Sequence, residues 1–197
     1  MKIWVSRAAA AAAGFALLTA GGCGATGASG GDITLTSEAL ELMGETVYTL
    51  GVGDQLRVNI FGEDDLSGEY VVDSSGSISM PLVGEVRARG LTVREFRTEL
   101  ERVLSAGYLN DPRVSAEVIN FRPFFIMGEV ESSGEYPYSD GLTVINAVAR
   151  AGGFTYRANT RVAFIKRAGA AQEVAVPLTQ TLRVMPGDTI RIGERFF

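Results

Sequence analysis

The sequence contains no histidine and a single cysteine, Cys23, in 197 residues. The absence of histidine excludes a Ser-His-Asp triad, a Cys-His nucleophile pair and a histidine-ligated metal site. One cysteine excludes an internal disulfide and a cysteine-rich zinc site. Basic residues are also in the minority, because 18 Lys and Arg face 23 Asp and Glu, for a net charge of −5. This charge balance argues against a nucleic-acid binder.

Long hydrophobic runs are absent except for the alanine-rich stretch 8–20. Lys2 and Arg7 precede this stretch and small residues follow it, which is the order of a secretory signal. The run is shorter than the roughly 20 residues of a comfortable membrane span. We therefore predict a signal peptide over residues 1–22, the alternative being a buried alanine helix of the folded domain.

The only cysteine directly follows this predicted signal. The order Ala20-Gly21-Gly22-Cys23 resembles a bacterial lipoprotein signal, although Ala20 stands where such signals usually carry a larger aliphatic residue. The resemblance implies a lipid on Cys23 and, since Gly24 follows, an outer-membrane protein that faces the periplasm. Cleavage by the ordinary signal peptidase is the alternative. Residues 23–46 are predicted to be the lipid anchor and a flexible tether, with a short helix over 37–43 that Ser37 caps.

From residue 48 onward the pattern has a period of two, which indicates strands. Asp73 to Ser77 is typical of a turn and predicts a hairpin between its flanking strands. The predicted strands cover residues 55–60, 70–72, 78–80, 84–89, 114–119, 124–127, 135–138, 162–166, 173–176 and 189–192.

Two helices interrupt these strands. Thr92 and Glu95 form a capping box before an apolar stripe that runs to residue 104. Thr143 begins a shorter helix, which Gly152 and Gly153 end. We therefore predict an α+β fold of two small strand-rich domains with one main helix each, over residues 47–121 and 122–197. Gly-Asp followed by an apolar-Arg-apolar strand occurs in both, at 53–58 and 187–192.

No arrangement of residues predicts catalysis. The acidic cluster at residues 63–65 lacks both the partner a glycosidase needs and the spacing of a calcium loop, so a solvated loop is the favoured interpretation. No phosphate-binding loop, metal site or cofactor site is recognisable. Tyr136, Tyr138 and Tyr156, with Arg157 beside the last, are candidate sugar contacts. Core packing is the alternative for these aromatic residues.

A set of Gly, Pro and Asp residues at turns carries a family resemblance. Its members are Gly53, Asp54, Gly76, Pro81, Gly84, Gly128, Gly134, Gly152, Gly153, Pro186, Gly187 and Asp188. With the apolar residues around them, they resemble the outer-membrane polysaccharide export family of Wza-like lipoproteins. The resemblance runs from about residue 48 to about residue 192 and implies a polysaccharide-export domain followed by one β-grasp (SLBB) domain. The turn residues would then determine the fold.

The resemblance also implies a function. Such proteins form a ring and a non-enzymatic conduit for capsular polysaccharide or exopolysaccharide, together with an inner-membrane co-polymerase or tyrosine kinase. Because the chain stops soon after residue 192, we expect it not to form a pore with a C-terminal helix, so that another protein, such as a separate β-barrel, completes the conduit. The alternatives are a lipid-anchored periplasmic carbohydrate-binding or regulatory module and an enzyme.

Overall fold

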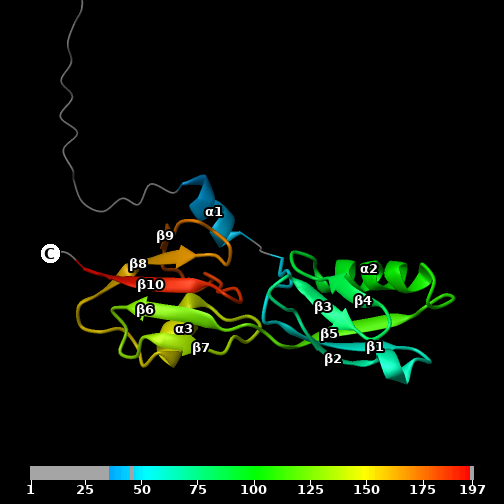
Figure 1. Cartoon of the computed structure of the whole chain (residues 1–197). Coiled ribbons are helices and arrows are strands. Elements are labelled where there is room, and N and C mark those ends of the chain that lie inside the picture. Colours follow the sequence, from blue (N-terminus) through cyan, green and yellow to red (C-terminus); the bar gives the residue numbers. More distant parts are fainter. Residues whose placement is uncertain (1–35, 45–46, 196–197) are drawn as a thin grey trace, which may run out of the picture. The chain divides into compact units, whose positions relative to one another are not determined.

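The computed structural model describes residues 36–44 and 47–195 (Figure 1). The predicted signal peptide, Cys23 and most of the predicted tether lie outside these residues. Helices and strands are mixed along the described chain, with separate hydrophobic cores in its first and second halves. The predicted α+β class is confirmed.

An antiparallel sheet of three strands organises the first half, in the order β2-β1-β5. The central strand β1, Gln55–Ile60, buries Leu56, Val58 and Ile60 and turns the alternate residues outward, as its period of two predicts. Its neighbours are β2 (Gly68–Val71) and β5 (Val114–Asn120). A short 3-10 helix, Asp64–Leu66, contains part of the acidic cluster.

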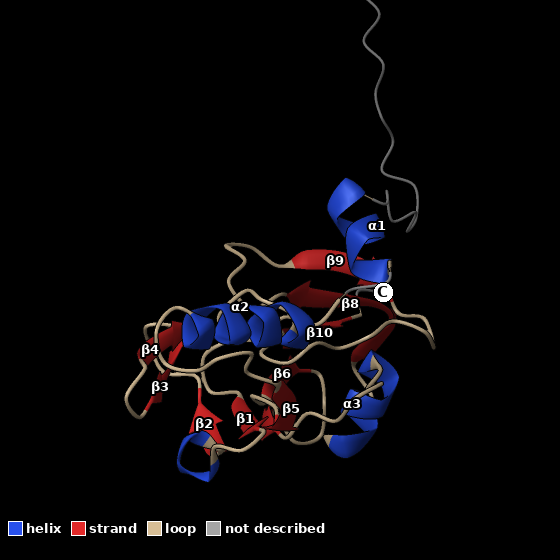
Figure 2. Ribbon diagram, turned by 90° about the vertical axis from the view of Figure 1, so that its right-hand side faces the viewer, coloured by secondary structure: helices blue, strands red, loops and turns tan. Residues whose placement is uncertain are grey.

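Helix α2, Val93–Ser105, covers this core and packs against β5 (Figure 2). The capping box is present, because Thr92 accepts a hydrogen bond from the Glu95 amide while the Glu95 carboxylate accepts one from the Thr92 amide. Phe96, Leu100 and Leu104 on its apolar stripe are fully buried. The predicted helix is confirmed with its cap.

The hairpin predicted around residues 73–77 is wrong in its pairing. The turn forms, since the Asp73 carboxylate accepts from the amides of Ser75 and Ser77. However, β2 pairs with β1, and β3 (Ser77–Met80) pairs with β4 (Gly84–Arg87). The amide and carbonyl of Val72 are bonded to the turn at 53–54, so the chain that leaves β2 stays paired with the residues before β1.

The second half is a mixed five-stranded sheet in the order β7-β6-β10-β8-β9. The strands are β6 (Phe124–Gly128), β7 (Gly134–Tyr136), β8 (Ala158–Lys166), β9 (Val174–Pro177) and β10 (Thr189–Glu194). Only β10 and β6 are parallel among these pairs, and the chain between them contains α3, Val144–Arg150, as well as β7, β8 and β9. A helix after the first hairpin and a central parallel pair make this half β-grasp-like, as predicted.

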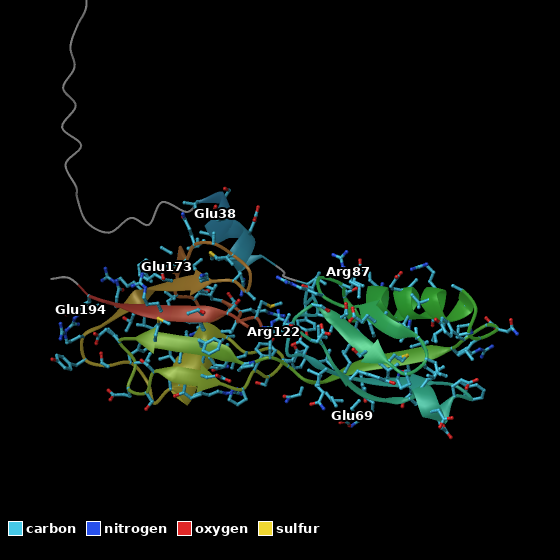
Figure 3. All side chains as sticks on the ribbon, in the orientation of Figure 1. Glu38, Glu69, Arg87, Arg122, Glu173 and Glu194 are labelled. Carbon is cyan, nitrogen blue, oxygen red and sulfur yellow. The ribbon has the colours of Figure 1, made fainter. Side chains whose placement is uncertain are left out.

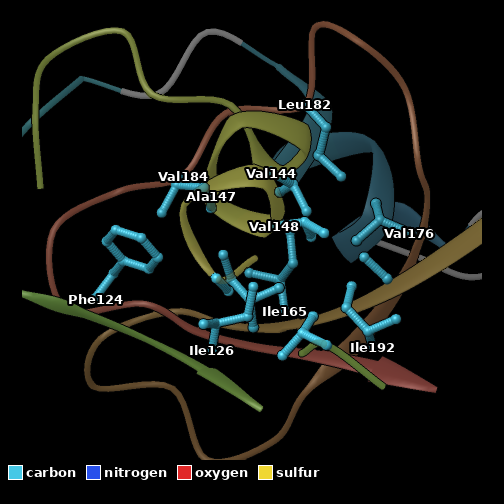
Figure 4. Packing of buried hydrophobic residues seen from close by; sticks show 14 of the residues in the cluster. Phe124, Ile126, Val144, Ala147, Val148, Ile165, Val176, Leu182, Val184 and Ile192 are labelled. Atoms are coloured by element: carbon cyan, nitrogen blue, oxygen red, sulfur yellow. The ribbon is translucent and has the colours of Figure 1, made fainter. Parts of the chain in front are cut away.

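The core of this half lies between the sheet and α3 (Figure 4). Val144, Ala147 and Val148 of the helix pack there against Ile126 and Ile165 of the sheet. Thr143 caps α3 by accepting from the Asn146 amide, as predicted. The helix ends as predicted too, because the amides of the two glycines that follow it donate to carbonyls of its last turn.

Helix α1, Ser37–Met43, is present where a short helix was predicted, but its N-cap is Thr36 and not Ser37. The Thr36 hydroxyl accepts from the Ala39 amide at 3.2 Å, and Ser37 is the first helical residue. Ala39 and Leu42 are buried in the second core, where α1 packs on β9. This part of the predicted tether is therefore a packed element.

Candidate functional site

Two aspartates, Asp54 and Asp188, are the fully buried charged residues of the described chain. Each follows a glycine with positive φ and directly precedes a central strand, β1 or β10. Burying a carboxylate is costly unless it is paired and hydrogen-bonded. The repeated Gly-Asp pattern therefore marks two buried ionic sites as well as two turns.

Asp54 accepts four hydrogen bonds, which we call the Asp54 clasp. Gly51 donates its amide at 2.7 Å, and the Tyr48 hydroxyl donates at 2.5 Å. Arg122 donates twice, from its amide at 2.9 Å and from Nη1 at 2.6 Å. Burial and the bond to Asp54 raise the pKa of Tyr48 above its ordinary value, so the hydroxyl remains a donor. The clasp joins the first half to the residue that begins the second.

Two glycines make room for the Arg122 guanidinium. A Cβ on Gly51 would lie 2.7 Å from Arg122 Cζ, and a Cβ on Gly187 would lie 2.7 Å from Arg122 Nε. Both distances are shorter than real Cβ contacts. Figure 3 shows Arg122 at the connection between the two halves. Gly51 belongs to the turn before β1 and Gly187 to the turn before β10, so one arginine depends on both Gly-Asp turns.

Asp188 forms the second ionic site. Its carboxylate pairs with Arg167 and accepts from the Met185 amide at 2.8 Å. Arg167 also donates to the carbonyl of Leu42 at 3.3 Å, which ties α1 to this site. Asp188 Oδ1 and Arg167 Nε are buried without a hydrogen-bond partner. Burial raises the pKa of Asp188 to about 6, although the charge of Arg167 acts in the opposite direction.

A ladder of aromatic rings runs beside the Asp54 clasp. Tyr48 meets Phe121 edge-on with ring centroids 5.2 Å apart, and Phe121 meets Tyr138 in the same way at 5.2 Å. The Arg122 guanidinium carbon lies 5.9 Å from the centre of the Tyr48 ring. Such edge-to-face contacts add to stability beyond the contribution of the apolar area that the rings bury. Through Phe121, the ladder thus connects Tyr48 in the first half to Tyr138 in the second half by ring contacts.

A cavity of about 610 Å³ lies next to both ionic sites. Its polar lining includes Tyr48, Arg122, Arg167 and Asp188, with Glu38 and Glu41 of α1 beside them. The first four side chains are already bonded to each other or to the clasp. Within the described residues, no group of three metal-ligating side chains gathers here or elsewhere. The arrangement is suited to coupling the two halves of the described chain and to binding a ligand in the cavity.

The remaining predicted fold residues lie at bends of the backbone. Gly76 and Gly84 have φ of 87° and 84° around the β3–β4 pair, which Pro81 helps to connect. Gly128 ends β6 with φ of 89°, and a Cβ there would overlap the carbonyl of Ile192. Four more residues complete the set: Gly134 begins β7, Gly152 and Gly153 follow α3, and Pro186 lines the cavity.

The four candidate sugar contacts lie at three different places. Tyr136 packs on the second core, stacks on Phe124 and donates its hydroxyl to a backbone carbonyl. Tyr138 belongs to the aromatic ladder, and burial raises the pKa of its hydroxyl. Tyr156 is 84% exposed, while Arg157 is paired with Glu194. The structure does not bring the four together into one site.

Sequence reasoning missed Arg122, Tyr48 and Arg167 as members of the buried ionic sites. Arg122 lies 68 residues from Asp54 and Arg167 lies 21 residues before Asp188. No local pattern links positions so far apart. The one available signal was the repeated Gly-Asp pair, because an aspartate that precedes a buried strand needs a partner.

No helix among the described residues combines the length and apolar character needed to cross a membrane.

Comparison with known proteins gives two consecutive family matches. Residues 44–119 match the family described as polysaccharide biosynthesis/export protein, and residues 122–192 match the SLBB domain. The first match covers the half that contains β1 and α2, and the second covers the β-grasp-like half. Arg122 stands at the start of the second matched region.

Individual relatives have names of the same kind. The chain is 34% identical over 150 residues to the exopolysaccharide production protein ExoF of Rhizobium meliloti (strain 1021), an alignment of 70% of this chain and 36% of ExoF. It is 28% identical to the EPS I polysaccharide export outer membrane protein EpsA of Ralstonia nicotianae, covering 75% of this chain and 41% of EpsA. The polysialic acid transport protein KpsD of Escherichia coli is 25% identical over 75% of this chain and 28% of KpsD.

The chain thus spans well under half the length of these relatives. These relatives are named for production, export and transport, and their names describe no enzyme, in agreement with the expectation from the sequence. The family resemblance inferred from the turn residues is therefore confirmed, and the chain belongs to the polysaccharide biosynthesis/export family, with an export domain followed by an SLBB domain.

Proposed function

We propose that this chain is a non-enzymatic component of a conduit that exports capsular polysaccharide or exopolysaccharide, and that it acts as an oligomeric ring. The observation that carries the proposal is the match of two consecutive domains to an export family and to relatives named for export or transport. The Asp54 clasp supports it, because a ring subunit needs a fixed geometry between its domains. The polysaccharide chain and an inner-membrane co-polymerase or tyrosine kinase are the proposed partners.

The experiment that tests export is a deletion strain in which cell-associated and released polymer are measured separately. We expect released polymer to be lost while polymer synthesis continues, and the full chain to restore release. Loss of synthesis together with release would contradict the proposal, because an enzyme or a regulator of synthesis would produce that result. Polymer amounts are compared at equal cell density.

The proposed ring is tested separately by particle images and native mass of the full lipidated protein in detergent. We expect closed rings of several copies, because oligomers of one chain usually close by rotational symmetry. A monomer at native concentration would overturn the ring. It would favour the alternative of a lipid-anchored carbohydrate-binding or regulatory module.

The proposed location is the outer membrane, with a lipid on Cys23 and the folded domains in the periplasm. We expect Cys23→Ser to abolish incorporation of labelled fatty acid and to move the protein from the membrane fraction to the soluble periplasm. Membrane attachment that persists in Cys23→Ser would contradict the lipid anchor. Ser37→Ala is a suitable control, because Ser37 lies downstream of the signal and caps no helix.

A further inference from the structure

A crevice of about 520 Å³ lies beside the Asp54 clasp, and its charged lining differs from that of the 610 Å³ cavity, which includes carboxylates as well as arginines. It is lined by residues 49–52 and by Arg89 and Gly90 from the export domain, and by Arg122, Ala168, Gly169 and Gly187. Two arginines and no carboxylate residue line it. In a chain with a net charge of −5, this is a local concentration of positive charge.

Arg122 has a free hydrogen-bonding edge. Only Nη1 of its guanidinium is bonded, to Asp54 at 2.6 Å and to the carbonyl of Thr49 at 3.5 Å. Nε and Nη2 make no hydrogen bond in the described structure, and they are not among its buried unpartnered atoms. Both atoms therefore keep some exposure to solvent, although the Arg122 side chain as a whole is only 17% exposed. Together these two N–H groups form the fork that binds a carboxylate or phosphate with two parallel hydrogen bonds.

A glycine and the Asp54 clasp together position this edge of Arg122. Glycine at position 187 leaves space beside Nε, because a Cβ there would lie 2.7 Å from that atom. The clasp fixes the other end of the guanidinium. A preorganised donor loses less conformational entropy on binding than a flexible one.

Arg89 supplies a second charge in the same crevice. It has no ion-pair partner among the described residues. Its stem rests against Gly76, where an added Cβ would lie 2.6 Å from Arg89 Cβ, and its amide donates to the Gly76 carbonyl at 2.8 Å. Asp54 neutralises one of the two guanidinium charges from its fully buried position, which leaves one positive charge for a ligand.

We propose that this crevice binds an anionic oxygen group of a saccharide, a carboxylate or a phosphate, through the Nε–Nη2 edge of Arg122 and the guanidinium of Arg89. The anion class rests on the crevice itself. The saccharide part rests on the proposed function, since an exported acidic polymer would carry such groups.

The proposal is tested by amide chemical-shift titration of the full chain without its signal peptide, with Cys23→Ser. The probes are glucuronate, inorganic phosphate and neutral glucose. We expect glucuronate or phosphate to shift the amides of residues 49–52 and 168–169, with affinity that falls as salt is added. Glucose at the same concentration should leave these amides unchanged.

Arg89→Gln changes the charge of the crevice without disturbing the fold, because Arg89 is exposed and lies outside the clasp. We expect it to weaken anion binding about threefold to fivefold, the size of an exposed charge pair. Arg161→Gln is the matched control, because Arg161 is also exposed, makes the same charge change and does not line the crevice. The anion affinity of Arg161→Gln should stay within about twofold of that of the unmodified protein.

Arg122→Lys tests the free edge. A lysine ammonium can still pair with Asp54 but offers no Nε–Nη2 fork, so anion affinity should fall about tenfold or more while the melting temperature changes less than in Arg122→Ala. Phosphate binding without glucuronate binding would identify phosphate groups as the ligand. Failure of both anions to bind, or equal effects of Arg89→Gln and Arg161→Gln, would overturn the proposal whatever the outcome of the export assay.

Discussion

At the scale of single residues, the most costly feature of the described chain is the removal of two carboxylates, those of Asp54 and Asp188, from water. Both carboxylate oxygens of Asp54 accept hydrogen bonds, and the donors are two backbone amides, a hydroxyl and a guanidinium. Asp188 keeps one buried oxygen without a partner. Two Gly-Asp turns that look alike in sequence therefore differ in how well their charge is satisfied.

The first prediction concerns the charge of Asp54. Asp54→Asn should destabilise the protein by about 3 kcal/mol, because Arg122 would keep its charge in a largely buried position without a counterion. The measurement is urea unfolding followed by circular dichroism. Glu117→Gln is the control, since Glu117 pairs with Arg57 on the surface and its loss should cost no more than about 0.5 kcal/mol. Equal effects would show that the clasp carries no special stability.

The second prediction concerns pH and Asp188. The folded pKa of Asp188, about 6, lies above its ordinary value of 3.8, so the folded state binds more protons between these two values. The contribution of this group to stability is therefore fully present below about pH 4 and is lost as pH rises through 6. Asp188→Asn cannot titrate, so the stability of the unmodified protein relative to this variant should fall by up to about 3 kcal/mol from pH 4 to pH 7.

Unfolding measured at intervals across this range checks the sign. A pH-independent difference between the two proteins would contradict it. Carboxylates whose pKa is lowered in the folded state, such as Asp73 and Glu95, act in the opposite direction, but they are the same in both proteins and cancel in the comparison.

Secondary-structure elements formed as predicted where the signals that specify them, such as a helix cap and an apolar stripe, lie within a few residues of each other. Helix α2 begins at a capping box and buries one stripe, and α3 begins at a threonine cap, as the sequence predicted. Pairing between strands did not follow local signals in the same way. The turn at Asp73 formed, yet its flanking strands have other partners, since β2 pairs with β1 and β3 pairs with β4.

The third prediction concerns the cap of α2. Thr92→Ala should destabilise the export domain by about 1 kcal/mol, because the Glu95 amide would lose its acceptor. Thr98→Ala is the control within the same helix, since Thr98 is exposed and its hydroxyl only donates to a carbonyl one turn earlier. It should change stability by less than about 0.5 kcal/mol. The prediction fails if thermal unfolding shifts by the same amount in both variants.

The molecule as a whole contains two cores that could unfold separately, one in each half. The described links between them are concentrated at the Asp54 clasp and the aromatic ladder. Arg122 takes part in the clasp and packs against both Gly-Asp turns. Coupling between the domains should therefore depend on this one side chain more than on any exposed contact.

The fourth prediction concerns this coupling. The unmodified protein should unfold in one cooperative transition, whereas Arg122→Ala should unfold in two, because each core remains intact while the link is lost. Calorimetry and urea titration with probes in each half measure this. Arg157→Ala is the control, because its ion pair with Glu194 lies within the second half and is half-exposed. A single transition in Arg122→Ala would contradict a coupling role.

The candidate site could be predicted only in part. The sequence singled out Asp54 and Asp188 through a repeated pattern and interpreted them as turn residues, which they are. It did not indicate that both are buried or that Arg122 and Arg167 pair with them. The aromatic candidates were chosen by type, and the structure distributes them among the second core, the ladder and the surface.

The sequence alone was sufficient for the α+β class, the positions of most strands and helices, the caps of α2 and α3 and the family, because each depends on patterns among residues that are close in the chain. The tertiary structure decided the partners of β2 and β3, the docking of α1 on the second core and the clasp across 68 residues. These features depend on which distant groups meet once the chain is folded. A buried charge selects its partner by proximity in space, and no local pattern encodes that proximity.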